Sequence, residues 1–321
     1  MVRSSTSTFQ SMEELHDEIK LKLGSKTLEP FGHGGGGCIS SGQGYTTDHG
    51  KVYLKVNSKA KARRMFDGEY ASLKAIAETH TVKTPTPMLV LDNPSGGALL
   101  VMEHLDMTGL SKHDAELGRQ LARMHLHNES VGKQTKKAEA SVHKDEDAVE
   151  YVSKYGFDTT TCCGFLPQDN TWCDDWPTFM ARKLSTQITR LQEEKNEKEA
   201  PELWSKLQLK FPSFFENVDI KPALLHGDLW GGNVAEYADG PVIFDPSSFY
   251  GHAEYDHGIA TMFGGFSHSF FKSYHELIPK CEGYATRQKI YQLFNYLNHW
   301  NHFGGGYRGS SVSIMRELVA S

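Results

Sequence analysis

The stretch LLHGDLWGGN at residues 224–233, with the apolar run PVIFDP at 241–246 behind it, constrains the fold more than any other part of the chain. Asp228 and Asn233 lie in a loop after one short apolar run. Asp245 ends the next run, and Pro246 prevents that strand from continuing. Two strand ends can therefore direct two carboxylates and an amide to one point. Magnesium prefers such hard oxygen donors and completes its shell with phosphate oxygens and water. This pattern makes Asn233 and Asp245 candidate magnesium ligands and leaves Asp228 as a candidate base.

The same loop has a purely structural interpretation, because Asp, Asn and Gly are the usual residues of turns. Features upstream favour the catalytic interpretation. A glycine-rich turn, GHGGGGCISSG at 32–42, precedes Lys55 by about twenty residues, the pattern of backbone N–H groups that cover phosphates with a lysine behind them. We therefore expect a phosphate-binding loop there.

Lys55 and Glu69 each stand where a charge is unexpected, and one ion pair explains both. In KVYLKV at 51–56 the residues alternate, which places Lys55 on the face opposite Val52 and Leu54. In the helical pattern that follows, Glu69 falls on a largely apolar face, where an unpaired carboxylate would be costly. We expect Lys55 and Glu69 to pair.

The remaining patterns divide the chain into two lobes of an α+β protein. A disordered tail is predicted for residues 1–11, and a helix from Ser11 to Gly24 follows it. Residues 87–92 and 98–103 read as a hairpin, so 12–105 is predicted to form a small lobe with an antiparallel sheet. Residues 106–321 are predicted to form a mainly helical lobe with a flexible, charge-rich insertion near 129–150.

Composition excludes several classes of protein. A net charge of −6 and a pI near 6.2 argue against a nucleic-acid partner, and no apolar run reaches the ~18 residues of a membrane span. Five cysteines, an odd number in a long chain, favour reduced thiols and a cytoplasmic location. The Ser/Thr-rich start, with one arginine and no acid, leaves N-terminal organelle targeting as an alternative.

The order glycine loop, strand lysine, helix glutamate, Asp-x4-Asn and strand-end Asp resembles the protein-kinase-like fold. HGD stands in place of His-Arg-Asp, DPS in place of Asp-Phe-Gly, and no Ala-Pro-Glu segment follows. These departures point to the small-molecule branch that includes aminoglycoside and choline kinases.

Within that branch the chain resembles the fructosamine and ketosamine kinase family from Met12 to its C-terminus. The motifs that carry the resemblance are GGGGCIS, VYLKVN, ARRMFDGEYASL, VMEHLDM, GFDTTTCCGFLPQ, ALLHGDLWGGNVAE, GPVIFDPSSFYGH, MFGGF and YQLFNYLNHWNHFGGGYRGSS. One departure is EYDHGIA, where an acidic and an apolar residue are expected in place of Asp256 and His257.

The resemblance implies an enzyme that uses ATP and Mg²⁺ to phosphorylate the 3-hydroxyl of ketosamines. Its substrates would be ribulosamines, psicosamines and also fructosamines, on glycated proteins or small amines. The unstable 3-phosphate would decompose and regenerate the amine, which amounts to protein deglycation. A kinase for another small metabolite and an ATP-binding pseudokinase are the alternatives. A dinucleotide-binding oxidoreductase fits less well, because GGGGC precedes a β pattern.

Individual roles follow from the chemistry of phosphoryl transfer, in which positioning and charge neutralisation dominate. We expect Asp228 to accept or orient the proton of the attacking hydroxyl, Asn233 and Asp245 to hold magnesium, and Lys55, fixed by Glu69, to contact the phosphates of ATP. The phosphate loop comprises Gly35, Gly36, Gly37, Cys38, Ile39 and Ser40. The hinge, whose backbone would bind adenine, comprises Glu103, His104 and Leu105.

Candidates on the substrate side are Trp230, His299 and Trp300. Trp230 can stack on the sugar or, alternatively, pack between the lobes. His226 is predicted to be a buried histidine that organises its loop. Cys38, close to backbone donors that favour a thiolate, is a candidate redox switch, with a small residue tolerated in a tight loop as its alternative. The resemblance implies a monomer or a redox-dependent homodimer linked through Cys38.

Overall fold

An antiparallel sheet of five strands forms the centre of the N-lobe in the structure, a computed structural model that describes residues 3–36, 40–139 and 150–321. The strands lie in the order β1-β2-β3-β5-β4. Their bounds are β1 Glu29–Gly36, β2 Ser41–Thr47, β3 Gly50–Asn57, β4 Pro87–Asp92 and β5 Ala98–Glu103. The hairpin predicted at 87–103 is thereby confirmed, with Leu91 paired to Leu99.

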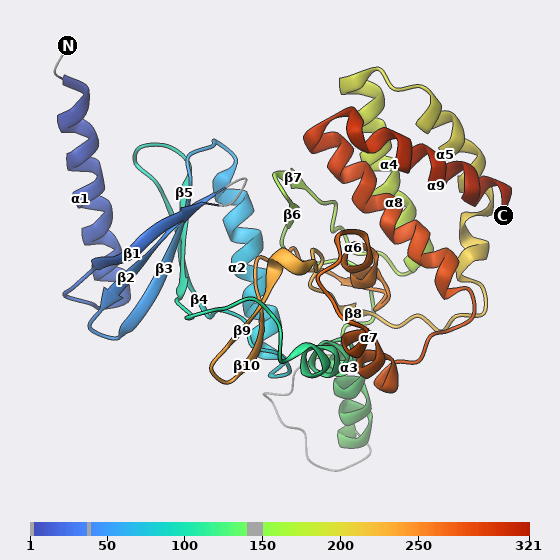
Figure 1. The fold of residues 1–321 in the computed structure, drawn as a ribbon, viewed down its shortest axis with the longest axis horizontal. Helices are drawn as coiled ribbons and strands as arrows, with labels where there is room; N and C mark the ends of the chain where they lie inside the picture. The colour runs from blue at the N-terminus through green and yellow to red at the C-terminus, as the bar shows by residue number, and fades with distance from the viewer. Residues whose placement is uncertain (1–2, 37–39, 140–149) are drawn as a thin grey trace.

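Two helices cover the two faces of this sheet (Figure 1), because its central strands are apolar on both sides. Helix α1 (Arg3–Leu23) packs Leu15 and Ile19 against a face that includes Val52 and Leu54. Helix α2 (Ala62–Glu78) packs against the opposite face, which looks toward the C-lobe. Alternation along β3 therefore turns Lys55 toward α2, as predicted.

The start of α1 differs from the prediction. The helix begins at Arg3 and so includes residues 3–11, for which a disordered tail was predicted. Once α1 is fixed to the sheet by Leu15 and Ile19, each residue added at its N-terminus gains one backbone hydrogen bond without a new nucleation cost. That extension needs no apolar stripe of its own, which is why the Ser/Thr-rich segment gave no helical signal.

The C-lobe is mainly helical, as predicted. Its helices are α3 Asp114–Glu139, α4 Trp176–Lys195, α5 Glu199–Lys210, α6 Tyr255–Phe263, α7 His268–Leu277, α8 Tyr284–Phe303 and α9 Arg308–Ala320. Its short strands are β6 Cys162–Cys163, β7 Leu166–Pro167, β8 Ala223–Leu224, β9 Val234–Tyr237, β10 Gly240–Ile243 and β11 Tyr250–Gly251. The largest core cluster joins α4, α5, α8 and α9.

The first part of the segment near 129–150, for which a flexible insertion was predicted, belongs to α3, which continues to Glu139. The later part of that segment, 140–149, lies outside the described residues. Among the residues that are described, no helix is long and apolar enough to cross a membrane.

The two lobes share a seam along α2. Gly68 lies so close to the C-lobe that a Cβ there would stand 2.5 Å from the carbonyl oxygen of Thr160. One turn later, the Ser72 hydroxyl accepts a hydrogen bond from the Ser248 N–H at 3.0 Å. Ile76 joins a core cluster otherwise built largely from the C-lobe. Helix α2, which carries Glu69, is thus fixed to both lobes.

Candidate active site

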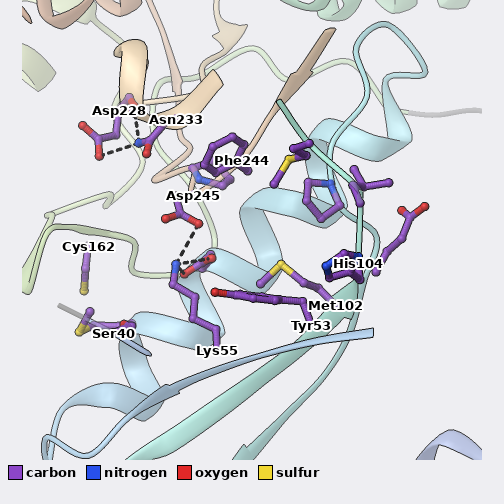
Figure 2. A pocket seen from close by; sticks show the side chains of 18 of the residues that line it. Ser40, Tyr53, Lys55, Met102, His104, Cys162, Asp228, Asn233, Phe244 and Asp245 are labelled. Atoms are coloured by element: carbon purple, nitrogen blue, oxygen red, sulfur yellow. Dashed lines mark hydrogen bonds and ion pairs between the residues drawn. The ribbon is translucent and has the colours of Figure 1, made fainter. Parts of the chain in front are cut away.

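A cavity of about 550 Å³ lies between the lobes and is lined by residues of both (Figure 2). Ser40, Lys55 and Glu69 come from the N-lobe, and Asp228 and Asp245 come from the C-lobe. The remaining predicted residues in its lining are Glu103, His104, Leu105, Trp230 and Asn233. This volume is typical of small-molecule sites.

Lys55 joins the two lobes inside the cavity. Its Nζ lies 2.8 Å from both carboxylate oxygens of Glu69, which confirms the expected pair, and 2.9 Å from Oδ1 of Asp245. Burial alone would lower the pKa of Lys55, but the carboxylates of Glu69 and Asp245 outweigh it and raise that pKa. Lys55 is therefore a fixed cation at the cavity wall.

Two unusual backbone conformations shape the acidic side of the site. Asp245 has φ +55°, a region that side chains other than glycine seldom adopt, so its neighbours must hold it there. Gly227 has φ +83°, and a Cβ on it would stand 2.1 Å from the carbonyl oxygen of Ser247. Glycine is needed at 227 because the loops that carry Asp228 and Asp245 pass this closely.

Buried polar groups hold the Asp228 loop. Asp256 accepts the backbone N–H groups of His226 and Gly227, each at 2.8 Å, and lies 3.1 Å from Nε2 of His125. His226 is fully buried; its Nε2 lies 3.0 Å from the Phe244 carbonyl, and its Nδ1 accepts the Asp228 N–H at 3.2 Å. Burial lowers the pKa of His226, so the ring is neutral. His226 is thus the loop-organising histidine that was predicted.

Asp228 and Asn233 face one another across this loop (Figure 2). The Asn233 side-chain N–H donates to the Asp228 carboxylate at 3.2 Å and to the Asp228 carbonyl at 2.9 Å. Both bonds use the amide nitrogen, which leaves the amide oxygen of Asn233 free as a ligand. Burial, followed by the negative charge of Asp245, raises the pKa of Asp228 to about 7. A carboxylate with this pKa is suited to accept a proton near neutral pH.

The oxygen donors fit the chemistry of magnesium, although the protein supplies few of them. The free amide oxygen of Asn233 and the carboxylate of Asp245, whose side chain is 44% exposed to the cavity, are hard donors. Within the described ranges, no group of three or more His, Cys, Asp or Glu could hold a metal ion. The residues present therefore fit a cation whose remaining ligands are phosphate oxygens and water.

Only one of the three backbone N–H groups of the predicted hinge is available to a ligand, within the described residues. The N–H groups of Glu103 and His104 are already used, by the carbonyls of Thr86 at 2.8 Å and Lys51 at 3.2 Å. The N–H of Leu105 has no hydrogen-bond partner in the described part of the chain. Of the three predicted hinge residues, Leu105 is thus the one whose backbone can donate to a ligand.

Other predicted residues are not all brought into the cavity. Gly35 and Gly36 end β1, whereas Gly37, Cys38 and Ile39 lie outside the described residues, so the Cys38 switch stays a prediction. His299 lies on α8 with its ring 4.9 Å from that of Phe263. Trp300, 3% exposed, belongs to the C-lobe core.

Sequence reasoning missed several lining residues, namely Tyr53, Met65, Met102, Cys162, Phe244 and Pro246. Tyr53 could have been found, because it shares with Lys55 the face of β3 that looks toward α2. Met102 lies opposite Tyr53 on β5, a register that the sequence alone does not give. Cys162 is a free cysteine at the cavity wall.

Comparison with known proteins agrees with the family resemblance carried by the sequence motifs, and it does so along nearly the whole chain. The family model described as fructosamine kinase matches residues 11–321. The chain is 56% identical to the mouse ketosamine-3-kinase, covering 94% of this chain and 98% of that protein. It is 38% identical to the chloroplastic protein-ribulosamine 3-kinase of Arabidopsis thaliana, over 91% of this chain and 83% of that one.

Solved structures agree on the fold. A Haemophilus somnus protein described as a fructosamine-3-kinase superposes with a TM-score of 0.75 at 21% identity, covering 97% of this chain and 99% of that one. The two-lobed fold predicted from the sequence is thereby confirmed.

Proposed function

Because the chain belongs to the fructosamine kinase family, we propose that it transfers the terminal phosphate of ATP to the 3-hydroxyl of ketosamines, sugars joined through C1 to an amine. Ribulosamines and psicosamines are the expected substrates, and fructosamines are further candidates. The observation that carries the proposal is the position of Asp228, with its pKa near 7, in one cavity with the Lys55–Glu69 pair. These groups supply a base and a fixed cation for phosphoryl transfer.

The proposed reaction divides the work among these residues. Asp228 accepts the proton of the 3-hydroxyl while the sugar oxygen bonds to phosphorus and the bond from phosphorus to ADP breaks. Lys55 binds phosphate oxygens of ATP, and Glu69 keeps its ammonium in place. The Leu105 N–H donates to adenine at the hinge. Asn233 and Asp245 would hold magnesium, which supplies neutralisation of phosphate charge when bound.

A pseudokinase is the weaker alternative, because each position that phosphoryl transfer needs is occupied by a competent side chain. Decomposition of the 3-phosphate would release the free amine and repair a glycated protein. A cytoplasmic location, and either a monomer or a redox-dependent homodimer linked through Cys38, are further parts of the proposal.

The test is phosphate transfer from ATP, with magnesium, to ribulosyl-lysine, fructosyl-lysine, choline or no acceptor, followed by mass spectrometry of the products. Phosphate is expected on the ketosamines alone. Asp228→Asn should reduce turnover by about a thousandfold or more, since it removes the base and keeps the shape. Asp239→Asn, an exposed acid between β9 and β10, is the matched control and should retain full activity. Transfer to choline alone, or to no acceptor, would contradict the proposal.

A further inference from the structure

A continuous row of aromatic rings leaves the cavity at Trp230 and returns to it beside Gly164. Neighbouring ring centroids along this aromatic arc are Trp230–Phe263 6.0 Å, Phe263–His299 4.9 Å, His299–Phe303 5.6 Å, Phe303–His302 5.6 Å and His302–Phe165 4.2 Å. Trp230 and Gly164 both line the cavity. The arc is assembled from the Asp228 loop, the ends of α6 and α8, and the β6–β7 turn, so separate parts of the C-lobe contribute to it.

The arc is an exposed apolar surface. Its exposed members are Trp230 (39%), Phe263 (42%), Phe165 (46%) and Phe303 (60%). Among side chains that the structure describes, these are the exposed Phe and Trp residues of the molecule. Exposed aromatic groups that gather in one place mark a binding surface, whereas isolated ones are ordinary. Because Trp230 also lines the cavity, the surface is continuous with the site and is placed to serve the substrate.

The arc is held in shape and carries no charge of its own. The Nδ1 of His302 lies 2.7 Å from the Asn298 carbonyl, and its Nε2 accepts the Phe165 N–H at 3.1 Å. Burial lowers the pKa of both His299 and His302, which keeps the two rings neutral. At the Trp230 end, a Cβ on Gly232 would stand 2.2 Å from the indole, so glycine lets that ring lie on the backbone. These contacts hold His302, the backbone at Phe165 and the Trp230 ring in place.

From this geometry we infer that the aromatic arc binds the lysine side chain and flanking polypeptide that carry the ketosamine. The inference rests on the proposed function and extends it to the substrate class. In a ketosamine, C3 is linked through C2 and C1 to the amine nitrogen, so a 3-hydroxyl at Asp228 places that nitrogen close to Trp230. The nitrogen is a secondary ammonium, which aromatic faces attract, and the lysine stem behind it is apolar. The uncharged aromatic surface continues outward from Trp230. It can therefore contact the ammonium, the apolar lysine stem and the flanking polypeptide in turn.

The inference predicts that the polypeptide around the modified lysine contributes to catalysis through binding. The enzyme should therefore prefer ribulosyl-lysine within a peptide that has leucine on both sides over ribulosyl-methylamine, measured as kcat/KM. Phe303→Ala and Phe165→Ala should each reduce this peptide-to-methylamine ratio by about 5- to 20-fold, mainly through KM, as expected for loss of one well-placed aromatic contact. Leu209→Ala removes an 88% exposed apolar side chain from α5, outside the arc, and should leave the ratio unchanged.

Thermal unfolding of each variant separates loss of binding from loss of fold, and the mass of the protein in solution is measured alongside. An unchanged ratio in both phenylalanine variants, with ketosamine phosphorylation intact, would overturn the inference and leave the proposed function standing. A dimer that Phe303→Ala dissociates would also overturn it, because a second copy of the chain would then cover the arc. If no ketosamine is phosphorylated at all, the proposed function itself fails.

Discussion

At the scale of single residues, the buried neighbours Asp256 and His257 have opposite consequences for stability. Asp256 is fully buried and binds the backbone on both sides of the Gly227 turn, so an acid there stabilises the catalytic loop. His257 is also fully buried, but its Nε2 has no hydrogen-bond partner within the described ranges. Its Nδ1 lies 3.0 Å from the Tyr284 hydroxyl. An unsatisfied buried nitrogen costs stability.

His257→Leu is therefore predicted to stabilise the protein, and more so in acid. Burial, followed by the nearby His125 and His275, lowers the pKa of His257 well below its usual value; Lys280 acts in the same direction, and Asp256 opposes it. The unfolded chain takes up a proton near pH 6.5, whereas the folded protein does not. The wild type thus loses stability as the pH falls below 6.5, and the variant lacks that loss.

Urea unfolding at pH 8 and pH 5.5 measures this difference. We expect a gain in the free energy of unfolding of about 1 kcal/mol at pH 8 and a larger gain at pH 5.5. A gain for His257→Leu that is equal at both pH values would contradict the argument.

At the scale of elements, Glu236 on β9 fixes the linker that runs from the hinge to α3. Its carboxylate accepts the N–H groups of Ser111 at 3.2 Å and Lys112 at 2.9 Å and the Ser111 hydroxyl at 2.9 Å. Its backbone also pairs with Thr108. The Lys112 N–H first, then the Ser111 groups, lower the pKa of Glu236 to about 2 against the effect of burial. Ionised Glu236 thus stabilises the linker above pH 4.5, and this contribution is lost as the pH falls toward 2.

Glu236→Gln should lower the Tm at pH 7, because an amide presents one acceptor oxygen where the carboxylate presents two. The difference in Tm between Glu236→Gln and the wild type should become steadily smaller as the pH falls below 4.5. Differential scanning calorimetry between pH 3 and pH 7 tests this, with Glu216→Gln, an exposed acid after the 3-10 turn at 211–215, as the control. A Tm difference that stays constant over this range would show that the linker does not depend on the ionised carboxylate.

The same scale shows what the sequence could and could not predict. Strand alternation was enough to orient Lys55, and the cost of an unpaired carboxylate was enough to pair it with Glu69, because both arguments use local periodicity. Trp300, a candidate on the substrate side, lies in the C-lobe core, and the sequence could not show this for the complementary reason. On α8 it lies next to His299, but which of the two points outward depends on how α4 and α9 pack against that helix. The place of Met102 in the cavity lining likewise depends on the register between β3 and β5, which the sequence does not give.

At the scale of the whole molecule, the two lobes are joined through a continuous core. Ile76 at the end of α2 and Val82 after it pack with Leu121, Ile243 and other C-lobe residues in one cluster. Helix α2 also holds Glu69, which holds Lys55, and Lys55 contacts Asp245 across the cavity. Lobe packing and alignment of the site are thus mechanically linked at the α2 seam. The lobes are expected to unfold in one transition rather than independently.

Gly68→Ala tests this link, since a Cβ at 68 would stand 2.5 Å from the Thr160 carbonyl oxygen and 2.9 Å from the Thr161 Cα, both backbone atoms. The methyl group must push α2 away from the C-lobe, which should cost about 1 to 3 kcal/mol of unfolding free energy. Because the shift moves Glu69 relative to Asp245, ATP affinity measured by calorimetric titration should fall about tenfold as well. Gly109→Ala, at an exposed glycine with open space around it, is the matched control and should change neither quantity. If Gly68→Ala lowers stability while ATP binds as tightly as before, the seam holds the lobes together without setting the geometry of the site.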